Sequence, residues 1–457
     1  MLKQRLIFPG VTAALLGLLL LPLGAFAQQN NKAAGQNPIV VMISIDGFPA
    51  RALKDPRLPM PVLRSLEAQG AHAEAMTPIN PTVTWPNHTT LITGVNASGH
   101  QVLENGLLTF PADGSAPVVK PWTPKDELVH ARTLYEAAAD KGLVTGQVDW
   151  VAIYGAKNVR WEFAEEPRLD GPIVRELFAQ GAIRREDAGF AASSSPTWRD
   201  EIWTDAAIDI LTLHTPDLLL FHLLQTDTLQ HQYGPLTPAA YAAYANADHC
   251  IGRLVEAARQ AGLLARITFI IVSDHGFASY SHMIHPNVAL AERGLIAQRD
   301  GSWKGEAWFV PEGGSALLYI RDTARREEIV AKLKAYFATV PGVAGAYTNE
   351  EAQKLGIPAR AASDQAPDLF LAAKPDYAFG NGMTGEIVTD LQTPRGAHGY
   401  LNSDSDMDAL FIASGAHIRS GVDLGVITNL RVAPTVAKIL GVSLPAATEL
   451  PLAEALQ

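Results

Sequence analysis

Acidic and histidine side chains recur just past apolar, strand-like stretches of this sequence. Carboxylates and imidazoles are ordinary protein ligands for divalent metal ions, zinc in particular. In an open α/β sheet, ligands bind outside the carboxyl ends of the strands, so residues far apart in sequence can meet there. Three aspartates and three histidines are enough to hold two metal ions. They are Asp46, Asp227, His231, Asp274, His275 and His398.

The apolar stretches themselves predict the elements that position these side chains. Residues 39–45, 218–224 and 267–272 are apolar runs of strand length, and each ends next to one of the candidate ligands. His398 lies between two glycines, before another apolar run at residues 410–412. We therefore expect the candidate ligands to converge on one edge of a sheet.

A threonine-rich segment at residues 82–94 contains a candidate nucleophile. Pro86 suits the first turn of a helix, and Gly94 suits its end. Thr84 would then lie at a helix N-terminus, where the helix dipole favours negative charge. A hydroxyl that also binds a divalent metal can become a nucleophilic alkoxide near neutral pH. A simple helix cap is the alternative for a lone threonine.

Strand and helix patterns alternate along most of the chain. Helices are expected around residues 61–67, before Gly70, and from about 238 to 262. A further helix is expected at residues 429–441. This alternation predicts an α/β fold with a mostly parallel sheet covered by helices on both faces.

The stretch from about residue 281 to 397 differs from the rest of the chain in its residue pattern. It contains one charged helix candidate, residues 325–339, between segments rich in proline and glycine. We interpret residues 281–397 as a smaller inserted cap region. Residues 39–280 and 398–457 then form the catalytic α/β domain, preceded by a flexible lead at residues 28–38.

The first 27 residues have the pattern of a signal peptide. Lys3 and Arg5 give a positive start, residues 11–21 are apolar, and residues 25–27 resemble a cleavage site. We expect cleavage after Ala27 and a periplasmic or secreted protein without a transmembrane helix. An uncleaved membrane anchor is the alternative.

Composition narrows the classes of function. The chain has 457 residues, 47% of them hydrophobic, which is enough for a large core. Its formal charge of −11 argues against a general nucleic-acid-binding surface. Small anionic substrates remain compatible, because bound metal ions reverse the local field. Cys250 is the only cysteine, so an intrachain disulfide is excluded.

Four short blocks in order resemble the nucleotide pyrophosphatase/phosphodiesterase family of the alkaline-phosphatase superfamily. The second block departs from the family pattern, since Thr226 precedes it in place of proline and Gln230 replaces glycine. The blocks are Thr84-Trp85-Pro86-Asn87-His88, Asp227-Thr228-Leu229-Gln230-His231, Ser273-Asp274-His275-Gly276 and His398-Gly399-Tyr400.

This resemblance implies an alkaline-phosphatase-like fold and two zinc ions. By analogy Asp227, His231 and His398 bind one ion. Asp46, Asp274 and His275 bind the other, which also binds and activates Thr84. The implied reaction passes through a covalent phospho-threonine and keeps the configuration at phosphorus.

Three further residues are expected to contact the substrate. Asn105 lies at the family's distance after the nucleophile, and its amide would contact a non-bridging phosphate oxygen. It also precedes a glycine, so a plain turn is the alternative. Trp85 is a candidate apolar wall for a leaving group or nucleobase, or else a helix packing residue. Tyr154 or Trp161 is expected to help line the same pocket.

The resemblance favours phosphodiesters and nucleotide pyrophosphates as small substrates. Residues 151–160 lack the Lys-x-Arg pair of monoesterase relatives, so monoesters should be poorer substrates. The alternatives are a broad phosphomonoesterase, a lipid-headgroup phosphodiesterase and a non-catalytic zinc-binding protein of the same fold.

Other histidines are decoys in this interpretation. Asp248 and His249 resemble a ligand pair but fall inside a predicted helix, where neighbouring side chains diverge. His222 is expected in the core or beside the site, and His282 and His285 on the surface or beside the site. His88 is assigned a structural role.

Overall fold

Alternate side chains of strand β1 (Ile39–Ile45) enter two different hydrophobic cores. Val41 and Ile43 pack with one set of helices, whereas Val40 and Met42 pack with another set on the opposite face. Every residue of β1 is buried, as expected of a central strand in a sheet covered on both faces. These observations come from a computed structural model, which describes residues 37–188 and 195–457.

Strand β1 lies in an eight-stranded sheet that is mostly parallel. It pairs in parallel with β8 (Leu218–Leu223) on one side and β9 (Ile267–Val272) on the other. Only β19 runs antiparallel to its neighbours, β9 and β2. The order is β20 (Val422–Asp423), β2 (Ala71–His72), β19 (Phe411–Gly415), β9, β1, β8, β6 (Thr145–Val148) and β7 (Trp161–Phe163).

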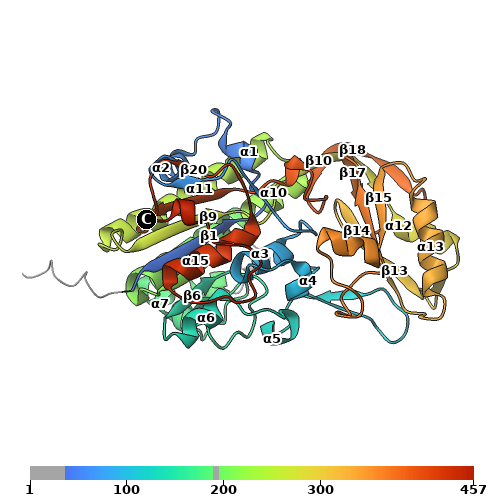
Figure 1. Cartoon of the computed structure of the whole chain (residues 1–457), viewed down its shortest axis with the longest axis horizontal. Coiled ribbons are helices and arrows are strands. Elements are labelled where there is room, and N and C mark those ends of the chain that lie inside the picture. Colours follow the sequence, from blue (N-terminus) through green and yellow to red (C-terminus); the bar gives the residue numbers. More distant parts are fainter. Residues whose placement is uncertain (1–36, 189–194) are drawn as a thin grey trace, which may run out of the picture. The chain divides into compact units, whose positions relative to one another are not determined.

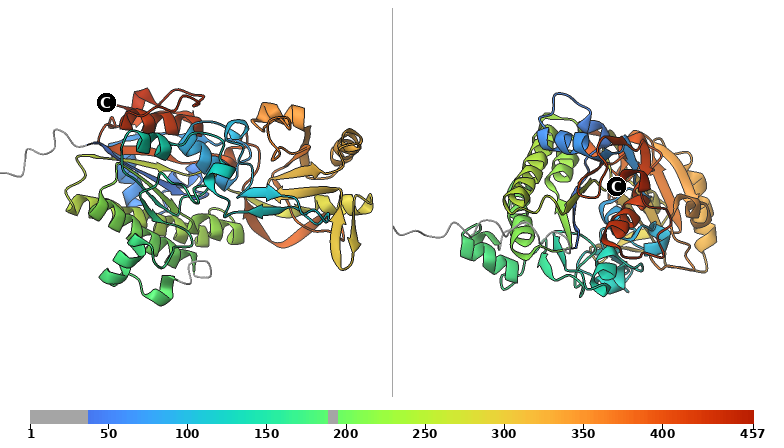
Figure 2. Two further views of the ribbon diagram at one scale, coloured as in Figure 1. Left: turned by 90° about the horizontal axis from the view of Figure 1, so that it is seen from below. Right: turned by 60° about the vertical axis from the view of Figure 1, so that its left-hand side comes forward.

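Helices cover both faces of this sheet, as Figure 2 shows. One face packs against α2 (Pro61–Gln69), α7 (Pro172–Gln180), α9 (Pro196–Asp209) and α11 (Pro238–Gln260). The other face packs against α3 (Thr84–Thr93), α6 (Leu134–Asp140) and α15 (Val432–Leu440). The predicted α/β class with a mostly parallel, doubly covered sheet is confirmed.

The helix boundaries follow the local signals in the sequence. Helix α2 ends at Gly70, and α3 ends at Gly94, which adopts the left-handed conformation at φ 72° that favours glycine. Other short helices connect these elements. They are α1 (Ala50–Leu53), α4 (Ala97–His100), α5 (Lys125–Leu128), α8 (Arg185–Ala188), α10 (Gln225–Tyr233), α12 (Pro286–Glu292) and α14 (Asn349–Ala352).

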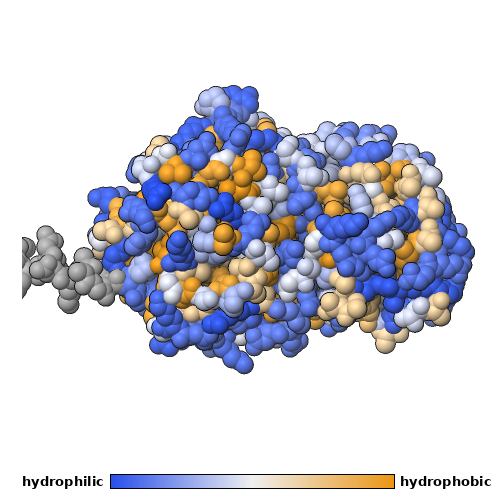
Figure 3. Space-filling view, viewed as in Figure 1, coloured by the Kyte–Doolittle hydropathy of each residue, from blue (hydrophilic) through white to orange (hydrophobic). Residues whose placement is uncertain are grey.

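Residues 281–397 contribute most of a second group of strands and helix α13 (Arg326–Phe337), at the right of Figure 1. A four-stranded antiparallel sheet has the order β13 (Ala307–Glu312), β14 (Ser315–Ile320), β16 (Leu369–Ala373) and β15 (Val343–Thr348). A separate three-stranded sheet has the order β17 (Asp376–Phe379), β10 (Ala278–Ile284) and β18 (Val388–Ala397). Polar residues cover much of the outer surface over α13 in Figure 3.

Residues 38–457 form one compact unit. The division of this unit into a catalytic domain and a cap region at residues 281–397 therefore stays a prediction. Strand β10 begins at Ala278 and therefore crosses the expected boundary near residue 280. The remaining strands are β3 (Ala75–Thr77), β4 (Leu107–Thr109), β5 (Val118–Lys120), β11 (Ile296–Arg299), β12 (Ser302–Gly305) and β21 (Val426–Thr428). The predicted signal peptide and most of the lead lie outside the described residues.

Candidate metal centre and active site

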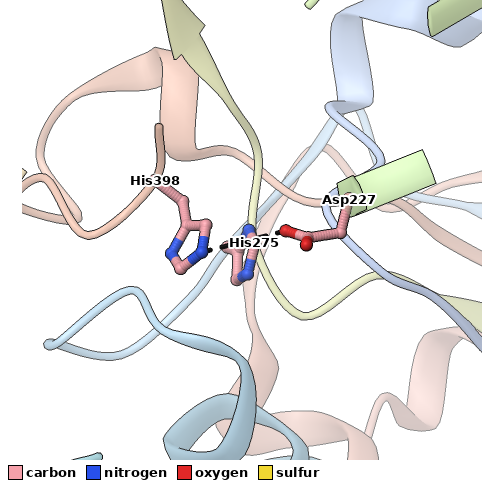
Figure 4. Close-up of side chains that lie close together, drawn as sticks. All are labelled: Asp227, His275 and His398. Carbon is pink, nitrogen blue, oxygen red and sulfur yellow. Dashed lines mark ion pairs between the residues drawn. The ribbon is translucent and has the colours of Figure 1, made fainter. Parts of the chain in front are cut away.

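Four separate elements bring the six predicted ligands together. Asp46 directly follows β1, and Asp274 and His275 follow β9. Asp227 and His231 lie one turn apart on α10, and His398 directly follows β18. Figure 4 shows the rings of His275 and His398 side by side with the carboxylate of Asp227 directed toward them.

Asp46, Asp274 and His275 form one possible metal-binding group. Ligand atoms of the three residues lie within 4.8 Å of one another, and all three residues are fully buried. The Nε2 atom of His275 is 3.2 Å from Oδ2 of Asp274 and 3.5 Å from Oδ1 of Asp46. This is the set that the sequence assigned to the ion beside Thr84.

The second group differs in one member from the predicted set. Asp227 and His398 meet the 4.8 Å spacing together with His275 rather than with His231. The Nε2 atom of His231 nevertheless lies 3.4 Å from Oδ1 of Asp227, and that of His398 lies 3.8 Å from the same oxygen. His275 therefore lies between the two groups, and the assignment of His231 stays a prediction.

Backbone carbonyls orient all three of these histidines in the same way. The Nδ1 atoms of His231, His275 and His398 lie 3.3, 3.0 and 3.0 Å from the carbonyl oxygens of Gly396, Gly276 and Thr82. An Nδ1–H group that donates to a carbonyl leaves Nε2 unprotonated and able to bind a metal ion. Each ring thus presents a free lone pair to the cluster.

The carboxylates of the cluster have buried oxygens that need a cation. Asp46 Oδ1, Asp227 Oδ1 and Asp274 Oδ2 have no hydrogen-bond partner among the described residues. Burial, followed by the charges of Asp274 and Asp227, raises the pKa of Asp46 well above its usual value. Buried like charges at this spacing are costly unless positive charge compensates them. The donor set, three carboxylates and three imidazoles, therefore fits two zinc ions.

Thr84 occupies the first position of α3, as predicted, and faces this cluster. Its Oγ1 lies 3.3 Å from Nε2 of His275, and the side chain is buried. His88, one turn further along α3, places Nδ1 2.9 Å from the Thr84 carbonyl and 3.5 Å from Asp274 Oδ2. His88 thus supports the first turn of α3 through the Thr84 carbonyl, which is a structural role.

Asn105 also meets the start of α3. Its side-chain oxygen accepts a hydrogen bond of 3.0 Å from the backbone N–H of Trp85, one of the donors that a helix N-terminus leaves free. The residue is solvent-exposed. Because the Asn105 side-chain oxygen accepts this hydrogen bond, the N–H groups of the same amide point away from the Trp85 backbone. A residue that donates to a phosphate oxygen requires its N–H groups in such a position.

A pocket of about 590 Å³ opens beside the nucleophile helix. Trp85 and Tyr154 both line it, whereas Trp161 is not among its lining residues. Trp122, which the sequence did not single out, lines it too, and its ring centroid is 6.1 Å from that of Tyr154. Trp122 and Tyr154 are 43% and 52% exposed, so both rings have open faces.

His222 connects the cluster to a second buried aspartate. Its Nε2 lies 3.1 Å from Asp46 Oδ2, and its Nδ1 lies 3.1 Å from Asp149 Oδ2. Although burial opposes the charged form, the contacts with Asp149 and Asp46 hold the pKa of His222 well above its usual value. His222 therefore supports a metal-ligand candidate, as its expected place beside the site implied, whereas Asp149 gave no sequence signal.

Asp200 was not predicted from the sequence, because it lies on one helix, α9, and caps the start of another, α10. From α9, its carboxylate accepts hydrogen bonds of 3.0 and 3.2 Å from the N–H groups of Leu224 and Gln225. These two N–H groups lie at the start of α10. The N-cap residue of this helix, Leu224, makes no capping hydrogen bond with its own side chain. Asp200 thus fixes the start of the helix that carries Asp227 and His231.

Two further acidic residues near the site were also missed. Glu104, next to Asn105, is buried, and neither of its carboxyl oxygens has a hydrogen-bond partner among the described residues. Burial and the neighbouring Glu312 raise the pKa of Glu104 well above its usual value. Glu312 is the last residue of β13, before the tight turn to β14 in which the N–H of Gly314 donates to the carbonyl of His398.

The other predicted decoys, apart from His88 and His222, have partners outside the cluster or are exposed. Asp248, on α11, accepts hydrogen bonds from the N–H groups of Val62 and Leu63 at the start of α2. Its neighbour His249 is exposed. His282 pairs with Asp390 at 2.7 Å, and His285 contacts Thr389. Cys250 is buried, as expected.

Comparison with known proteins identifies the family of this chain and supports its fold. The family model described as type I phosphodiesterase / nucleotide pyrophosphatase matches residues 40–401. The matched segment contains all six predicted ligands, Thr84 and Asn105. The chain belongs to this family.

Curated relatives share low identity over long segments. Human ectonucleotide pyrophosphatase/phosphodiesterase family member 7 is 24% identical over 94% of this chain and 85% of its own length. Bovine family member 3 (Bos taurus) is 23% identical over 52% of this chain and 25% of its own. Venom phosphodiesterase of Naja atra is 22% identical over 89% of this chain and 44% of its own. The chain thus spans less than half of the latter two relatives.

Solved structures support the fold. Murine ectonucleotide pyrophosphatase/phosphodiesterase 5, in an inactive threonine-to-alanine variant bound to AMP, superimposes with a TM-score of 0.71. The match covers 92% of this chain and 100% of the murine one at 17% identity. The human counterpart gives a TM-score of 0.66 at 19% identity, covering 89% of this chain and 95% of its own.

Within residues 37–188 and 195–457, every helix is too short or too polar to cross a membrane.

Proposed function

We propose that this protein is a two-zinc hydrolase that cleaves phosphodiester or nucleotide pyrophosphate bonds through a phospho-threonine at Thr84. One observation carries the proposal: the Thr84 hydroxyl faces a cluster of three carboxylates and three imidazoles contributed by four separate elements. Family membership and the names of the relatives support the same class of reaction.

The cluster divides into two proposed zinc sites. Asp46, Asp274 and His275 would hold the ion beside Thr84. Asp227, His231 and His398 would hold the other, with His275 close to both sites. Two bound zinc ions would supply Lewis acidity, lower the pKa of the nucleophilic hydroxyl and stabilise the attacking and leaving oxygens.

The chain's own residues then carry out two displacements at phosphorus. The Thr84 oxygen forms a bond to phosphorus while the bond from phosphorus to the leaving alcohol or phosphate breaks. The Asn105 amide donates to a non-bridging oxygen as negative charge develops there. Water then attacks phosphorus and the bond to Thr84 breaks, releasing the phosphate product and restoring the hydroxyl. Two inversions retain the configuration at phosphorus.

The pocket beside Trp85 favours an organic group on the substrate. The faces of Trp122 and Tyr154 are open to a planar group such as a nucleobase, since stacking on aromatic rings is worth about 1–3 kcal/mol per base. AMP in the murine neighbour's structure is consistent with this class of ligand. The absence of a Lys-x-Arg pair at residues 151–160 favours diesters over monoesters.

We also propose that the protein is exported. The sequence pattern of residues 1–27 supports this, as do relatives whose names mark them as ectoenzymes or venom components. N-terminal sequencing of the mature protein tests the proposal: a first residue of Gln28 is expected, and an intact Met1 on an exported chain contradicts cleavage.

A substrate panel at saturating zinc tests the activity. Nitrophenyl nucleotide diesters, dinucleotides and nucleoside triphosphates should be hydrolysed with higher kcat/KM than nitrophenyl phosphate. Preference for nitrophenyl phosphate would instead support the phosphomonoesterase alternative, and preference for glycerophospholipids the lipid-headgroup alternative. Zinc binding with no turnover on any substrate would support a non-catalytic protein.

A further inference from the structure

A second cluster of metal-ligand side chains lies at the opposite end of strand β8 from the catalytic cluster. His214 ends the π-helical turn η2 (Ile210–His214), shortly before β8 begins, whereas Asp227 follows the end of that strand. A strand of six residues spans about 20 Å. The second cluster is therefore separate from the catalytic one.

Three side chains from neighbouring helical segments form this cluster. Glu176 comes from α7, Asp209 ends α9, and His214 ends η2. One ligand atom of each lies within 4.8 Å of those of the other two. The Nε2 atom of His214 is 2.7 Å from Oε2 of Glu176, a hydrogen-bond distance, so these two side chains already converge.

Asp209 presents a buried oxygen without a partner. The residue is 3% exposed, and its Oδ2 has no hydrogen-bond partner among the described residues. The Gln180 amide donates to the other oxygen, Oδ1, and so fixes the orientation of the carboxylate. A buried carboxylate oxygen left unpaired is costly, and a bound cation removes that cost.

The second carboxylate increases the need for positive charge. The carboxyl groups of Glu176 and Asp209 repel each other when both are ionised. A divalent ion would neutralise both carboxylates at once.

The orientation and exposure of the histidine suit a metal ligand. Its ring stacks on Trp161 with centroids 3.7 Å apart and an interplanar angle of 20°. The side chains of His214 and Glu176 are 16% and 32% exposed, so an ion can enter from solvent. One imidazole with two carboxylates is a donor set typical of zinc, with a fourth position left for water.

Outside the cluster near Thr84, the histidine–carboxylate contacts of His282 and His72 lack this convergence. His282 contacts Asp390 through Nδ1 and Asp376 through Nε2, on opposite sides of its ring, so the two carboxylates cannot share one ion with it. His72 contacts a single carboxylate, that of Glu67, at 4.0 Å. Neither joins a group of three.

We propose that Glu176, Asp209 and His214 form a third zinc site, which joins α7 to the segment leading into β8 and stabilises that edge of the sheet. This site is independent of catalysis, because none of its residues approaches Thr84 or the catalytic cluster.

Zinc content of matched variants tests this proposal. The full chain is saturated with zinc, freed of unbound metal on a desalting column and analysed by mass spectrometry for zinc per chain. Glu176→Gln and Asp209→Asn should each bind one zinc fewer than the wild type, while kcat on a nitrophenyl diester stays within about twofold. Glu67→Gln, beside His72, is the control and should keep the wild-type zinc content.

A second measurement covers the case in which a variant folds poorly. Zinc added to the metal-depleted wild type should raise Tm further after activity has reached its plateau, and His214→Gln should lack that further rise. Equal zinc content in the wild type and all folded site variants would overturn the proposal. Because the readout is a difference of one zinc, it stands whether or not the catalytic assignment holds.

Discussion

The Thr84 hydroxyl oxygen lies 3.3 Å from Nε2 of His275, although 191 residues separate the two in sequence. The same nitrogen faces both Asp46 and Asp274. The helix N-terminus and the carboxyl ends of β1 and β9 therefore meet at one point, where a metal ion and a hydroxyl can act on the same phosphorus.

Replacing Thr84 with alanine tests the nucleophile. Thr84→Ala should lower kcat at least about 10³-fold, because no other hydroxyl occupies its place at the cluster. Zinc content should stay nearly normal, since the six proposed carboxylate and imidazole ligands remain. Thr93→Ala, at the far end of the same helix, should keep its turnover. Unchanged turnover in Thr84→Ala would rule out this nucleophile.

Removing His398 tests the metal assignment. His398→Ala should bind about one zinc fewer and lose activity together with it, as measured by metal analysis and nitrophenyl release. Chelation of the wild type should abolish activity, and added zinc should restore it. His282→Ala, which removes a surface histidine bound to Asp390, should change neither quantity. Full zinc content in His398→Ala would contradict its role as a ligand.

Two substitutions of Asn105 separate its two roles. Asn105→Asp keeps an oxygen for the Trp85 N–H but replaces the amide donor with a negative charge, so kcat/KM should fall about 10²–10³-fold with little loss of stability. Asn105→Ala should show the same catalytic loss and also lower the free energy of unfolding by about 1 kcal/mol. Normal kcat/KM in Asn105→Asp would leave only the structural role.

The pocket residue Tyr154 should affect substrate binding more than chemistry. Tyr154→Ala should raise KM for a nitrophenyl nucleotide diester about tenfold and change kcat little, because a stacking face is lost. A simple diester without a base should be affected much less. Tyr336→Ala, on α13 and outside the pocket, is the control. Equal effects on both substrates would argue against base stacking.

The buried cap Asp200 should make stability depend on pH. Burial raises its pKa to about 7 in the folded protein, above the value near 3.9 of an unfolded chain. The folded state therefore holds the proton more tightly, and the stabilisation is complete below about pH 4 and is lost as pH rises through 7.

Urea unfolding at several pH values measures this effect. The stability difference between the wild type and Asp200→Asn should be greater at pH 5 than at pH 8, because the variant has no proton to lose at this site. Asp300→Asn, at an exposed turn, should show a constant difference from the wild type. A difference for Asp200→Asn that does not change with pH would contradict the buried, raised pKa.

Much of the local structure could be predicted from sequence. The apolar runs gave the central strands because a strand buried on both faces needs a continuous apolar stretch. Pro61 and Gly70 marked α2, and Gly94 marked the end of α3, because these residues have restricted or unusual backbone preferences. Short sequence motifs, which are also local, indicated the residue types of the candidate ligands and the position of Thr84.

The contacts that complete the site were not visible in the sequence. His275 lies between both ligand groups, Asp149 holds His222, and Asp200 begins a helix on another element. Trp122 meets Tyr154 only because two loops fold against each other. Each of these contacts depends on packing between elements rather than on spacing along the chain.

The sequence by itself determined which side chains could bind metal, which hydroxyl could attack and which strands would carry them. The tertiary structure alone decided which nitrogen faces which oxygen, and it also brought Glu176, Asp209 and His214 together. The physical reason is that local backbone preferences act over a few residues, whereas ligand geometry arises from strand order and long-range packing, which no short stretch of sequence specifies.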